Sequence, residues 1–476
     1  MRLLTTITIL SIMLATLCGC SKRIDEMGLA FSGETTAEKV HLLIDETWVD
    51  ADGQRQVDQE IFDAVYAMID EAEEFLLIDF FLINDFLYQP GPGLRPLSQE
   101  LTDRLIAKRK KASGVRIVFI TDPINTVYGS VESPQFKAMQ EAGVEVVWTD
   151  LDRLRDSNPI YSKPWRLLVK PWGTGPGNAL ENPLGDGRIS LRSMLKMLNF
   201  KANHRKLVVS ERSLLVTSAN PHSASSAHWN VALRIDGAGM ELGCAAESAI
   251  IKMSGAGAVL PICDEPVYTQ SGNEMRADSP ASHKVELLTE QRIEEKALAL
   301  LNGAGEGDRI DLSMFYFSDR DVINALIQAR KRGCNVRVIL DPNKDAFGRT
   351  KNGIPNRQTA LRLVRKGIPV RWADTHGEQF HVKMLYVEQS NGMATLLLGS
   401  CNFSRRNLDN FNAECDAAVT ASMDDAVMVR TRRTFTRWWT NEDGRTFTTD
   451  YTTYEDRSMR RRLRAWLMET TGLSSF

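Results

Sequence analysis

Two stretches of the chain carry the same pattern of residues, and this pattern decides the architecture. They read His204-Arg205-Lys206-Leu207-Val208-Val209-Ser210-Glu211 and His381-Val382-Lys383-Met384-Leu385-Tyr386-Val387-Glu388. In both, a lysine follows a histidine by two positions and leads into apolar residues, which is typical of a strand that enters a core. Residues two apart in a strand project to the same face, so each histidine and its lysine can reach one ligand.

A second short element follows each of these stretches. The first is Thr217-Ser218-Ala219-Asn220, and the second is Gly399-Ser400-Cys401-Asn402. Serine hydroxyls and asparagine amides in a loop after a strand can supply uncharged hydrogen-bond donors. The combination of one imidazole, one ammonium group and nearby neutral donors therefore occurs twice.

The repeat extends upstream of these motifs. Both halves contain, in the same order, an apolar run, a helix-like segment and a strand that stops at an Asp-Pro pair, namely 74–85, 101–111 and Asp122-Pro123 against 308–319, 322–332 and Asp341-Pro342. Alternating strands and helices predict α/β units with helices covering a sheet. We expect an α/β fold with two pseudo-symmetric α/β lobes, each a mixed, largely parallel sheet flanked by helices, and an active site at the lobe interface.

Alignment of the two halves also predicts domain boundaries. We expect a first lobe at 21–236, a linker at 237–282, and a second lobe at 283–476 that ends in a helical tail. His204 follows Trp148 by 56 positions, whereas His381 follows Trp372 by only 9, which indicates an insert at about 151–198 in the first lobe. Tryptophan, leucine, methionine and interspersed basic residues suit an insert that packs on its own lobe, covers a site or contacts a membrane interface.

Composition indicates a folded protein and weighs against a nucleic-acid partner. The chain has 476 residues, of which 43% are hydrophobic and 25% charged, and its formal net charge is −3. Such a balance gives no overall electrostatic attraction to nucleic acid. Local basic runs at 108–111 and in the C-terminal 430–462 suit solvated helix faces or, alternatively, attraction to anionic lipid head groups.

The N-terminus is typical of an export signal. Arg2 precedes an apolar stretch that ends in Leu17-Cys18-Gly19-Cys20, and this ending resembles a bacterial lipoprotein box with Cys20 as the lipidated residue. Plain cleavage and retention as a membrane anchor are the alternatives. We expect a signal peptide at 1–20 and a lipoprotein of the bacterial cell envelope, anchored in the outer membrane and facing the periplasm.

Cysteine spacing bears on disulfides and metals. Cys244 and Cys263 are close enough in sequence for one disulfide in an oxidising periplasm. No Cys-x-x-Cys pair and no cluster of histidine and cysteine has the spacing of a zinc site. The sequence therefore predicts no metal and no cofactor.

The duplicated His-x-Lys motif, with Ser-x-Asn downstream in each half, resembles the hallmark of the phospholipase D superfamily, and the resemblance covers about residues 41–419. It implies that one imidazole attacks phosphorus to give a covalent phosphohistidine while the other transfers protons. The nucleophile would be His204 and the acid/base His381, although pseudo-symmetry leaves this order open. Two lysine ammonium groups would neutralise the phosphate without a metal.

The resemblance also implies roles for the neighbouring residues. Lys206, Lys383, Ser218, Asn220, Ser400 and Asn402 would bind the phosphoryl group. Glu414 would pair with an imidazole, whereas the first half offers only His228-Trp229-Asn230 at the corresponding place. Glu211 and Glu388 stand where the family motif usually has aspartate, and we expect them to be structural.

Within the superfamily, Asn203-His204-Arg205-Lys206 looks most like cardiolipin synthases and related phosphatidyl-transfer enzymes. We expect a phosphodiesterase or phosphatidyltransferase that acts on phospholipids, by hydrolysis or by head-group transfer. We also expect a monomer with an internal pseudo-dimer that reaches the membrane through its lipid anchor. The alternatives are an exported nuclease of the same superfamily and a lipid-binding lipoprotein with weak catalysis.

Overall fold

The computed structural model describes residues 28–237, 239–257, 260, 283–346, 349–472 and 474. The expected signal peptide with Cys20, most of the expected linker, and Cys263 of the expected disulfide lie outside these ranges. Within them, no helix combines the length and the apolar character needed to cross a bilayer.

The first half of the chain forms an eight-stranded sheet. Its strands, in spatial order, are β3 (Arg55–Gln59), β2 (Lys39–Val49), β11 (Asn230–Asp236), β10 (Ser213–Thr217), β9 (Lys206–Ser210), β4 (Phe75–Phe80), β5 (Arg116–Thr121) and β6 (Glu145–Trp148). Only β4, β5 and β6 pair in parallel. The repeated motif begins at β9, which places His204 immediately before the strand.

The second half repeats this arrangement in a nine-stranded sheet. Its strands, in spatial order, are β1 (Ser32–Ala37), β12 (His283–Thr289), β20 (Cys415–Ser422), β19 (Met393–Gly399), β18 (Lys383–Glu388), β13 (Arg309–Met314), β14 (Asn335–Leu340), β17 (Val370–Ala373) and β21 (Thr448–Asp450). Here β13, β14 and β17 are parallel. Strand β1 belongs to the span expected for the first lobe, yet it pairs with β12 and so links the two halves.

The expected α/β class and the two similar lobes are confirmed. The expectation of largely parallel sheets was wrong, because antiparallel pairs outnumber parallel ones in both sheets. Part of the cause is local. The strands that follow His204 and His381, β9 and β18, turn back through short connections into β10 and β19, and a short connection between neighbouring strands produces an antiparallel pair. Longer connections then return the chain antiparallel as β11 and β20.

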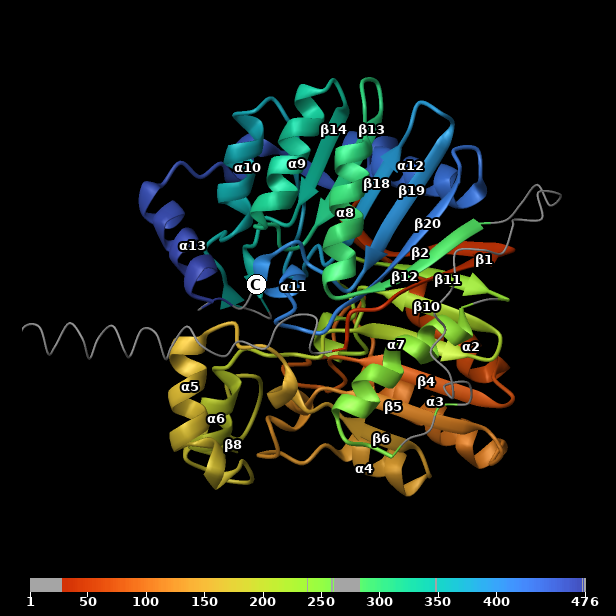
Figure 1. The fold of residues 1–476 in the computed structure, drawn as a ribbon, viewed down its shortest axis with the longest axis vertical. Helices are drawn as coiled ribbons and strands as arrows, with labels where there is room; N and C mark the ends of the chain where they lie inside the picture. The colour runs from red at the N-terminus through yellow and green to blue at the C-terminus, as the bar shows by residue number, and fades with distance from the viewer. Residues whose placement is uncertain are drawn as a thin grey trace, which may run out of the picture.

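Helices cover the outer face of each sheet (Figure 1). The first sheet is covered by α2 (Ile61–Glu71), α3 (Leu97–Lys111) and α4 (Pro134–Glu141), and the second by α8 (Gln291–Gly303), α9 (Arg320–Lys331) and α10 (Asn356–Val364). Two further helices, α7 (Met240–Met253) and α12 (Ala426–Thr440), each contact strands of both sheets. The lobes are thus joined along two sides.

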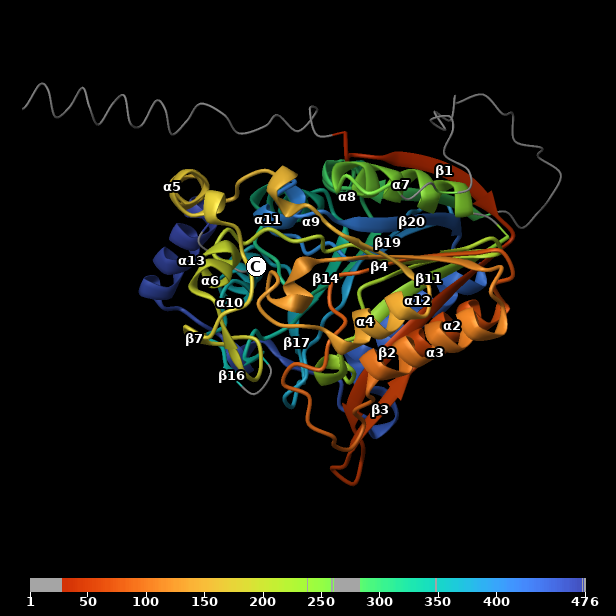
Figure 2. The same cartoon turned by 90° about the horizontal axis from the view of Figure 1, so that it is seen from below.

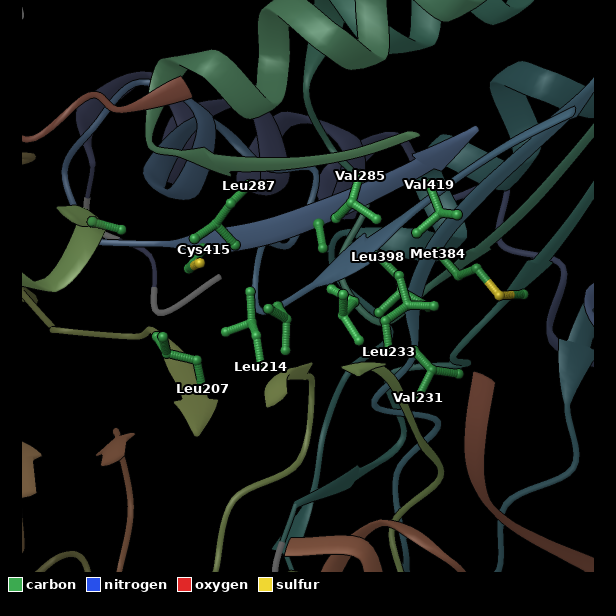
Figure 3. Close-up of a cluster of buried hydrophobic side chains, with 14 of the residues drawn as sticks. Leu207, Leu214, Val231, Leu233, Val285, Leu287, Met384, Leu398, Cys415 and Val419 are labelled. Atoms are coloured by element: carbon green, nitrogen blue, oxygen red, sulfur yellow. The ribbon is translucent and has the colours of Figure 1, made fainter. Parts of the chain in front are cut away.

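The inner faces of the sheets pack against each other through one hydrophobic core. Figure 3 shows Leu207, Leu214, Val231 and Leu233 of the first sheet opposite Val285, Leu287, Met384, Leu398, Cys415 and Val419 of the second. Alternate residues of β9 divide between this core and the helix-covered face, as a period of two requires. Because the two inner faces pack against each other, the N-terminal ends of β9 and β18 are held close to the interface between the lobes.

The remaining elements are short or peripheral. The insert contains α5 (Pro159–Leu168), η4 (Lys170–Trp172), α6 (Leu191–Met197) and a hairpin of β7 (Leu180–Glu181) and β8 (Arg188–Ile189), and the helical tail is α13 (Met459–Thr471). The others are η2 (Pro123–Thr126), η3 (Leu151–Arg153), η5 (Ser223–Ser225), β15 (Asp345–Ala346), β16 (Arg349–Thr350), α11 (Arg405–Leu408), η6 (Glu442–Gly444) and η7 (Tyr451–Tyr454). Both views place α5, α6 and α13 together at one end of the molecule (Figures 1 and 2).

Candidate active site

A cavity of about 310 Å³ lies where the two lobes meet, and both halves of the repeat line it. His204 and Asn220 of the first half face it together with His381 and Asn402 of the second. The structure therefore brings the two predicted histidines into one shared cavity. The two lysines and Glu414 lie behind the histidines and are buried.

An aspartate from a neighbouring strand end holds the backbone in front of each histidine. The carboxylate of Asp122 accepts the backbone N–H of Asn203 at 2.8 Å, and that of Asp341 accepts the backbone N–H of Phe380 at 2.8 Å. Both aspartates come from the Asp-Pro pairs that end β5 and β14. Each bond fixes the backbone of the residue that precedes a histidine. The aspartate of the repeated Asp-Pro pair therefore helps to set the position of each histidine.

The two lysines are buried in equivalent settings. The Nζ of Lys206 donates to the carbonyl oxygen of His204 at 2.6 Å, and the Nζ of Lys383 donates to that of His381 at 2.8 Å. Burial lowers the pKa of Lys206 to about 7, although the negative charge of Glu414 acts to raise it. Burial also lowers the pKa of Lys383. An anion that enters the cavity would favour the charged form of both ammonium groups.

An aromatic ring packs against each histidine and lysine. The ring of Phe81 lies 5.1 Å from that of His204, and the ring of Phe315 lies 4.9 Å from that of His381. Each ring also faces the lysine of its own half, at 5.4 Å for Lys206 and 5.1 Å for Lys383. The rings confine the imidazoles and offer each ammonium group a cation–π contact.

Glu414 of the second lobe orients His204 of the first. Its Oε2 lies 2.9 Å from the Nδ1 of His204, and it also accepts the hydroxyl of Ser400 at 2.5 Å. The side-chain amide of Asn407 donates to the other carboxylate oxygen. Burial raises the pKa of Glu414 to about 7, and burial with two nearby lysines lowers the pKa of His204. Since Nδ1 is occupied, Nε2 is the ring nitrogen that can act on a ligand.

Asn230 of the first lobe orients His381 of the second. Its Oδ1 lies 3.1 Å from the Nδ1 of His381 and accepts the hydroxyl of Ser218 at 3.0 Å. Its Nδ2 donates to the backbone oxygen of His228 at 3.0 Å. Burial and the positive charges of the lysines lower the pKa of His381. The arrangement copies that around His204, with an amide in place of the carboxylate.

Backbone hydrogen bonds also cross between the lobes next to both histidines. The N–H of His204 donates to the carbonyl of Ala413 at 2.8 Å, and the N–H of Trp229 donates to that of Gln379 at 3.0 Å. Each imidazole is therefore held by the lobe that does not contain it. Neither half-site is complete without the other lobe.

The predicted phosphate-binding residues divide into two groups. Asn220 and Asn402 line the cavity, and among the described residues the Oδ1 of Asn402 is buried without a hydrogen-bond partner. Ser218 and Ser400 do not face the cavity. Their hydroxyls donate to Asn230 and Glu414, because the loops turn them toward the orienting residues. That the two serines bind phosphate stays a prediction, and in this structure their hydroxyls hold the residues that orient the histidines.

The two motif carboxylates lie at the far ends of their strands. Glu211 accepts the backbone N–H groups of Glu73 and Phe75 at 2.7 and 3.2 Å. Glu388 forms an ion pair with Arg309 at 3.2 Å and another with Arg432 at 2.5 Å. Neither carboxylate lines the cavity, and both make structural contacts.

Sequence reasoning missed a buried ion pair beside the first motif. Arg205, which is fully buried, pairs with Glu290 at 2.8 Å and with Glu247 at 3.1 Å. Glu290 in turn accepts the backbone N–H of Glu414 at 3.2 Å. The signal was the arginine itself, because a charged residue next to the start of a buried strand requires a partner when it is itself buried.

The comparisons with known proteins agree with this geometry. Residues 298–439 match a family model described as "Cardiolipin synthase, PLD-like domain". The match covers less than half of the chain and lies within the second lobe, which is therefore similar to a phospholipase D-like domain. The first lobe repeats the strand order and the histidine motif of the second.

One solved structure shows the same fold. The phosphatidylserine synthase of Haemophilus influenzae superposes with a TM-score of 0.58 at 10% identity, over 94% of this chain and 98% of that one. Two others superpose less well. They are the polyphosphate kinase of Porphyromonas gingivalis, at 0.46 with 11% identity over 92% of this chain and 54% of that one, and the phospholipase D family member Nuc of Salmonella typhimurium, at 0.28 with 20% identity over 36% and 98%. No curated protein matches the chain in sequence.

Proposed function

We propose that the chain is a phospholipase D-type phosphodiesterase or phosphatidyltransferase that acts on phospholipids through a covalent phosphohistidine. One observation carries the proposal. Two imidazoles from different lobes line a single cavity, each beside a buried lysine and each with its Nδ1 occupied by a residue of the opposite lobe.

In the first step, the Nε2 of His204 attacks phosphorus, so that a P–N bond forms and the bond from phosphorus to the leaving alcohol breaks. His381 in its protonated form donates a proton to the leaving oxygen. Burial and lysine charges lower the pKa of His381 in the free protein. The entering phosphodiester anion offsets these lysine charges and favours the imidazolium form that this step needs.

In the second step, His381 removes a proton from water or from an alcohol, which attacks phosphorus and breaks the P–N bond. Attack by water completes hydrolysis, and attack by an alcohol completes head-group transfer. In both steps, the positive charges of Lys206 and Lys383 stabilise the negative charge on the non-bridging oxygens. The amides of Asn220 and Asn402 act as neutral hydrogen-bond donors.

Three observations support a phospholipid as the substrate. Apolar and aromatic side chains make up much of the cavity wall, including Phe81, Tyr128, Met197, Phe200 and Phe315. The matched family model is described as cardiolipin synthase, and the most extensive structural match above is named phosphatidylserine synthase. The formal net charge of −3 gives no overall electrostatic attraction to nucleic acid.

A paired assay tests the substrate. The purified protein and its His204→Ala variant are incubated with mixed bacterial phospholipids and, separately, with single-stranded DNA. We expect the wild type alone to release phosphatidic acid, or to form a new phosphatidyl ester when glycerol is added. Cleavage of DNA with the phospholipids intact would overturn the proposal in favour of a nuclease, and no turnover of either would favour a lipid-binding lipoprotein.

We further propose that Cys20 is lipidated and holds the protein at the periplasmic face of the outer membrane. The support is the Leu17-Cys18-Gly19-Cys20 sequence after a short apolar stretch. Metabolic labelling with a fatty-acid analogue should mark the wild-type chain and not the Cys20→Ser variant. Equal labelling of both chains would reject this anchor.

A further inference from the structure

Exposed apolar side chains are concentrated on two elements of the molecule. Among the described residues, twelve large hydrophobic side chains are exposed, and nine of them lie on the insert or on α13. The five on the insert are Ile160, Leu167, Leu168, Trp172 and Leu191, and the four on α13 are Met459, Leu463, Trp466 and Leu467. Single exposed apolar residues are ordinary, whereas a concentration of this kind marks a surface that contacts something.

The spacing of these residues is the same in both helices. On α13 they occupy positions 459, 463, 466 and 467, and on α5 the positions 160, 164, 167 and 168 carry isoleucine, proline and two leucines. Steps of four, three and one place the side chains on one face of a helix. The opposite face of α5 is already used, because Trp165 is buried there. Each helix therefore presents an apolar face that the described part of the chain leaves uncovered.

Basic residues are in excess beside these apolar faces. Residues 159–172 contain Lys163, Arg166 and Lys170 and no acidic residue, and residues 459–468 contain four arginines and no acidic residue. Asp156, Asp152 and Asp456, which precede the two helices, pair with Arg166, Lys170 and Arg461. The seven basic side chains outnumber these three carboxylates. All four arginines, at 460, 461, 462 and 464, are exposed. An exposed apolar face with tryptophan and flanking basic residues is typical of a helix that lies in the interface of an anionic bilayer. This charge complementarity favours lipid over a protein partner.

The two helices meet next to the cavity. Arg406 lines the cavity, and its guanidinium donates to Ser157 Oγ at 2.9 Å just before α5 and to the backbone oxygen of Gly472 at 3.0 Å just after α13. The end of α6 leads into Met197 and Phe200, which also line the cavity. Figures 1 and 2 show α5, α6 and α13 at the same end of the molecule, with α13 above α5 and α6 in Figure 1. Arg406 therefore connects the start of α5 and the end of α13 to the active-site cavity.

We propose that α5 with η4, together with α13, forms an interfacial surface that seats the cavity on an anionic phospholipid bilayer. The inference rests on the proposed function, because a phospholipid substrate must reach the cavity from a membrane. It adds the surface through which the enzyme contacts that membrane, independently of any N-terminal anchor.

Tryptophan quenching by brominated phospholipids tests contact directly. Trp172 and Trp466 are 72% and 49% exposed, and none of the other seven tryptophans in the chain is among the exposed large hydrophobic residues. The first tryptophan is Trp48, so an N-terminal segment inserted in the bilayer cannot produce the signal. All chains are full length and carry Cys20→Ser. We expect brominated phosphatidylglycerol–phosphatidylcholine vesicles to quench the wild-type fluorescence, and the Trp172→Phe/Trp466→Phe variant to lose most of that quenching.

Controls separate the surface from the rest of the molecule. Trp48→Phe, on β2, should leave quenching unchanged, and vesicles of brominated phosphatidylcholine alone should quench far less. Absence of quenching in the wild type, unchanged quenching in the double variant, or equal quenching by the uncharged vesicles would each overturn the proposal. None of these readouts depends on turnover, so they decide the surface even if the phospholipid is not the substrate.

A kinetic arm connects the surface to the reaction. A Leu167→Ser/Leu168→Ser/Leu463→Ser/Leu467→Ser variant should lose about tenfold or more in turnover of vesicle phospholipid and keep its rate on a soluble nitrophenyl phosphodiester. Met393→Ser/Val429→Ser, at two positions exposed to 38% and 37% outside these helices, is the matched control and should behave as the wild type. Equal loss on the soluble substrate would indicate damage to the fold or to the cavity and would refute a docking role.

Discussion

The two half-sites share one plan and differ in one side chain. In each, a histidine at the start of a core strand binds through Nδ1 to a residue of the opposite lobe, which a serine hydroxyl holds in place. For His204 that residue is the carboxylate Glu414, and for His381 it is the amide Asn230. The first imidazole therefore faces a group that can take a negative charge, and the second faces a neutral one.

This difference assigns roles that the internal symmetry leaves open. A histidine that is phosphorylated at Nε2 and keeps its proton on Nδ1 carries positive charge, and a buried carboxylate stabilises that charge better than an amide does. A histidine that must release its proton to a leaving group benefits from a low pKa, which a neutral partner preserves. The asymmetry favours His204 as the nucleophile and His381 as the acid and base.

The largest expected effect separates the two histidines. His204→Ala should reduce turnover by about 10⁴-fold and form no covalent adduct, because the attacking nitrogen is gone. His381→Ala should still be phosphorylated by a substrate with a good leaving group, such as a nitrophenyl phosphodiester, since that group departs without a proton. The measurements are the nitrophenolate burst and the acid-labile label on the protein. A burst from His204→Ala and none from His381→Ala would reverse the assignment.

A second comparison concerns the middle residue of each motif. Arg205 is buried in an ion pair with Glu290 and Glu247, whereas Val382 is buried in the apolar core. Arg205→Met should lower the free energy of unfolding by about 3–5 kcal/mol, because it leaves buried carboxylates without a partner. Val382→Ala should lower it by about 2 kcal/mol, through lost apolar burial and the space that remains. Urea unfolding measures both.

The pH dependence provides the control for Arg205→Met. Burial raises the pKa of Glu290 even beside the arginine. Without the arginine, the folded state disfavours the charged glutamate more strongly, so the destabilisation should grow as pH rises above the ordinary glutamate pKa and shrink toward pH 5. A loss of stability that is the same at pH 5 and pH 8 would contradict this account of the pair.

Local patterns in the sequence predict much of the fold and of the site. The strands that follow His204 and His381, the helices before them and the shared interface all came from short apolar runs and their repetition. The pairing of β1 with β12 did not, because it joins residues about 250 positions apart in sequence and depends on packing between the lobes. The antiparallel share of the sheets was missed because periodicity describes a strand and not its neighbours.

The contacts that orient the two histidines were not predicted, because they depend on how loops turn within each lobe and on how the lobes pack together. Asn230 was noted for lacking a carboxylate, and the structure shows that its amide oxygen occupies the same place. Ser218 and Ser400 were expected at the phosphate, although the turn of their loops points them at the orienting residues. The Asp-Pro pairs were interpreted only as strand ends, yet their recurrence in both halves was a signal of the backbone contact that precedes each histidine.

Removing the carboxylate would make the half-sites alike. Glu414→Gln keeps an oxygen for the Nδ1 of His204 and removes the charge, so it should lower kcat by about 100-fold. The fold should tolerate the change, because Ser400 and Asn407 remain nearby. Steady-state rates and circular dichroism measure the two effects. A rate equal to that of the wild type would show that the charge difference between the half-sites has no role in the reaction.

The smallest change supplies the charge that the second half-site lacks. Asn230→Asp places a carboxylate beside the Nδ1 of His381, whose pKa burial and the lysines lower in the native protein. The carboxylate favours the imidazolium, so the pKa of His381 rises, by about 1 pH unit or more if the aspartate is ionised. Because the first step needs protonated His381, the alkaline limb of kcat/KM should move to higher pH, and the rate at low pH should change little.

Asn230→Ala, which removes the partner without adding charge, should lower the rate at every pH and leave the limb in place. An unmoved limb in Asn230→Asp would mean that His381 is not the group that loses its proton there, and the roles inferred from the two half-sites would then have to be exchanged.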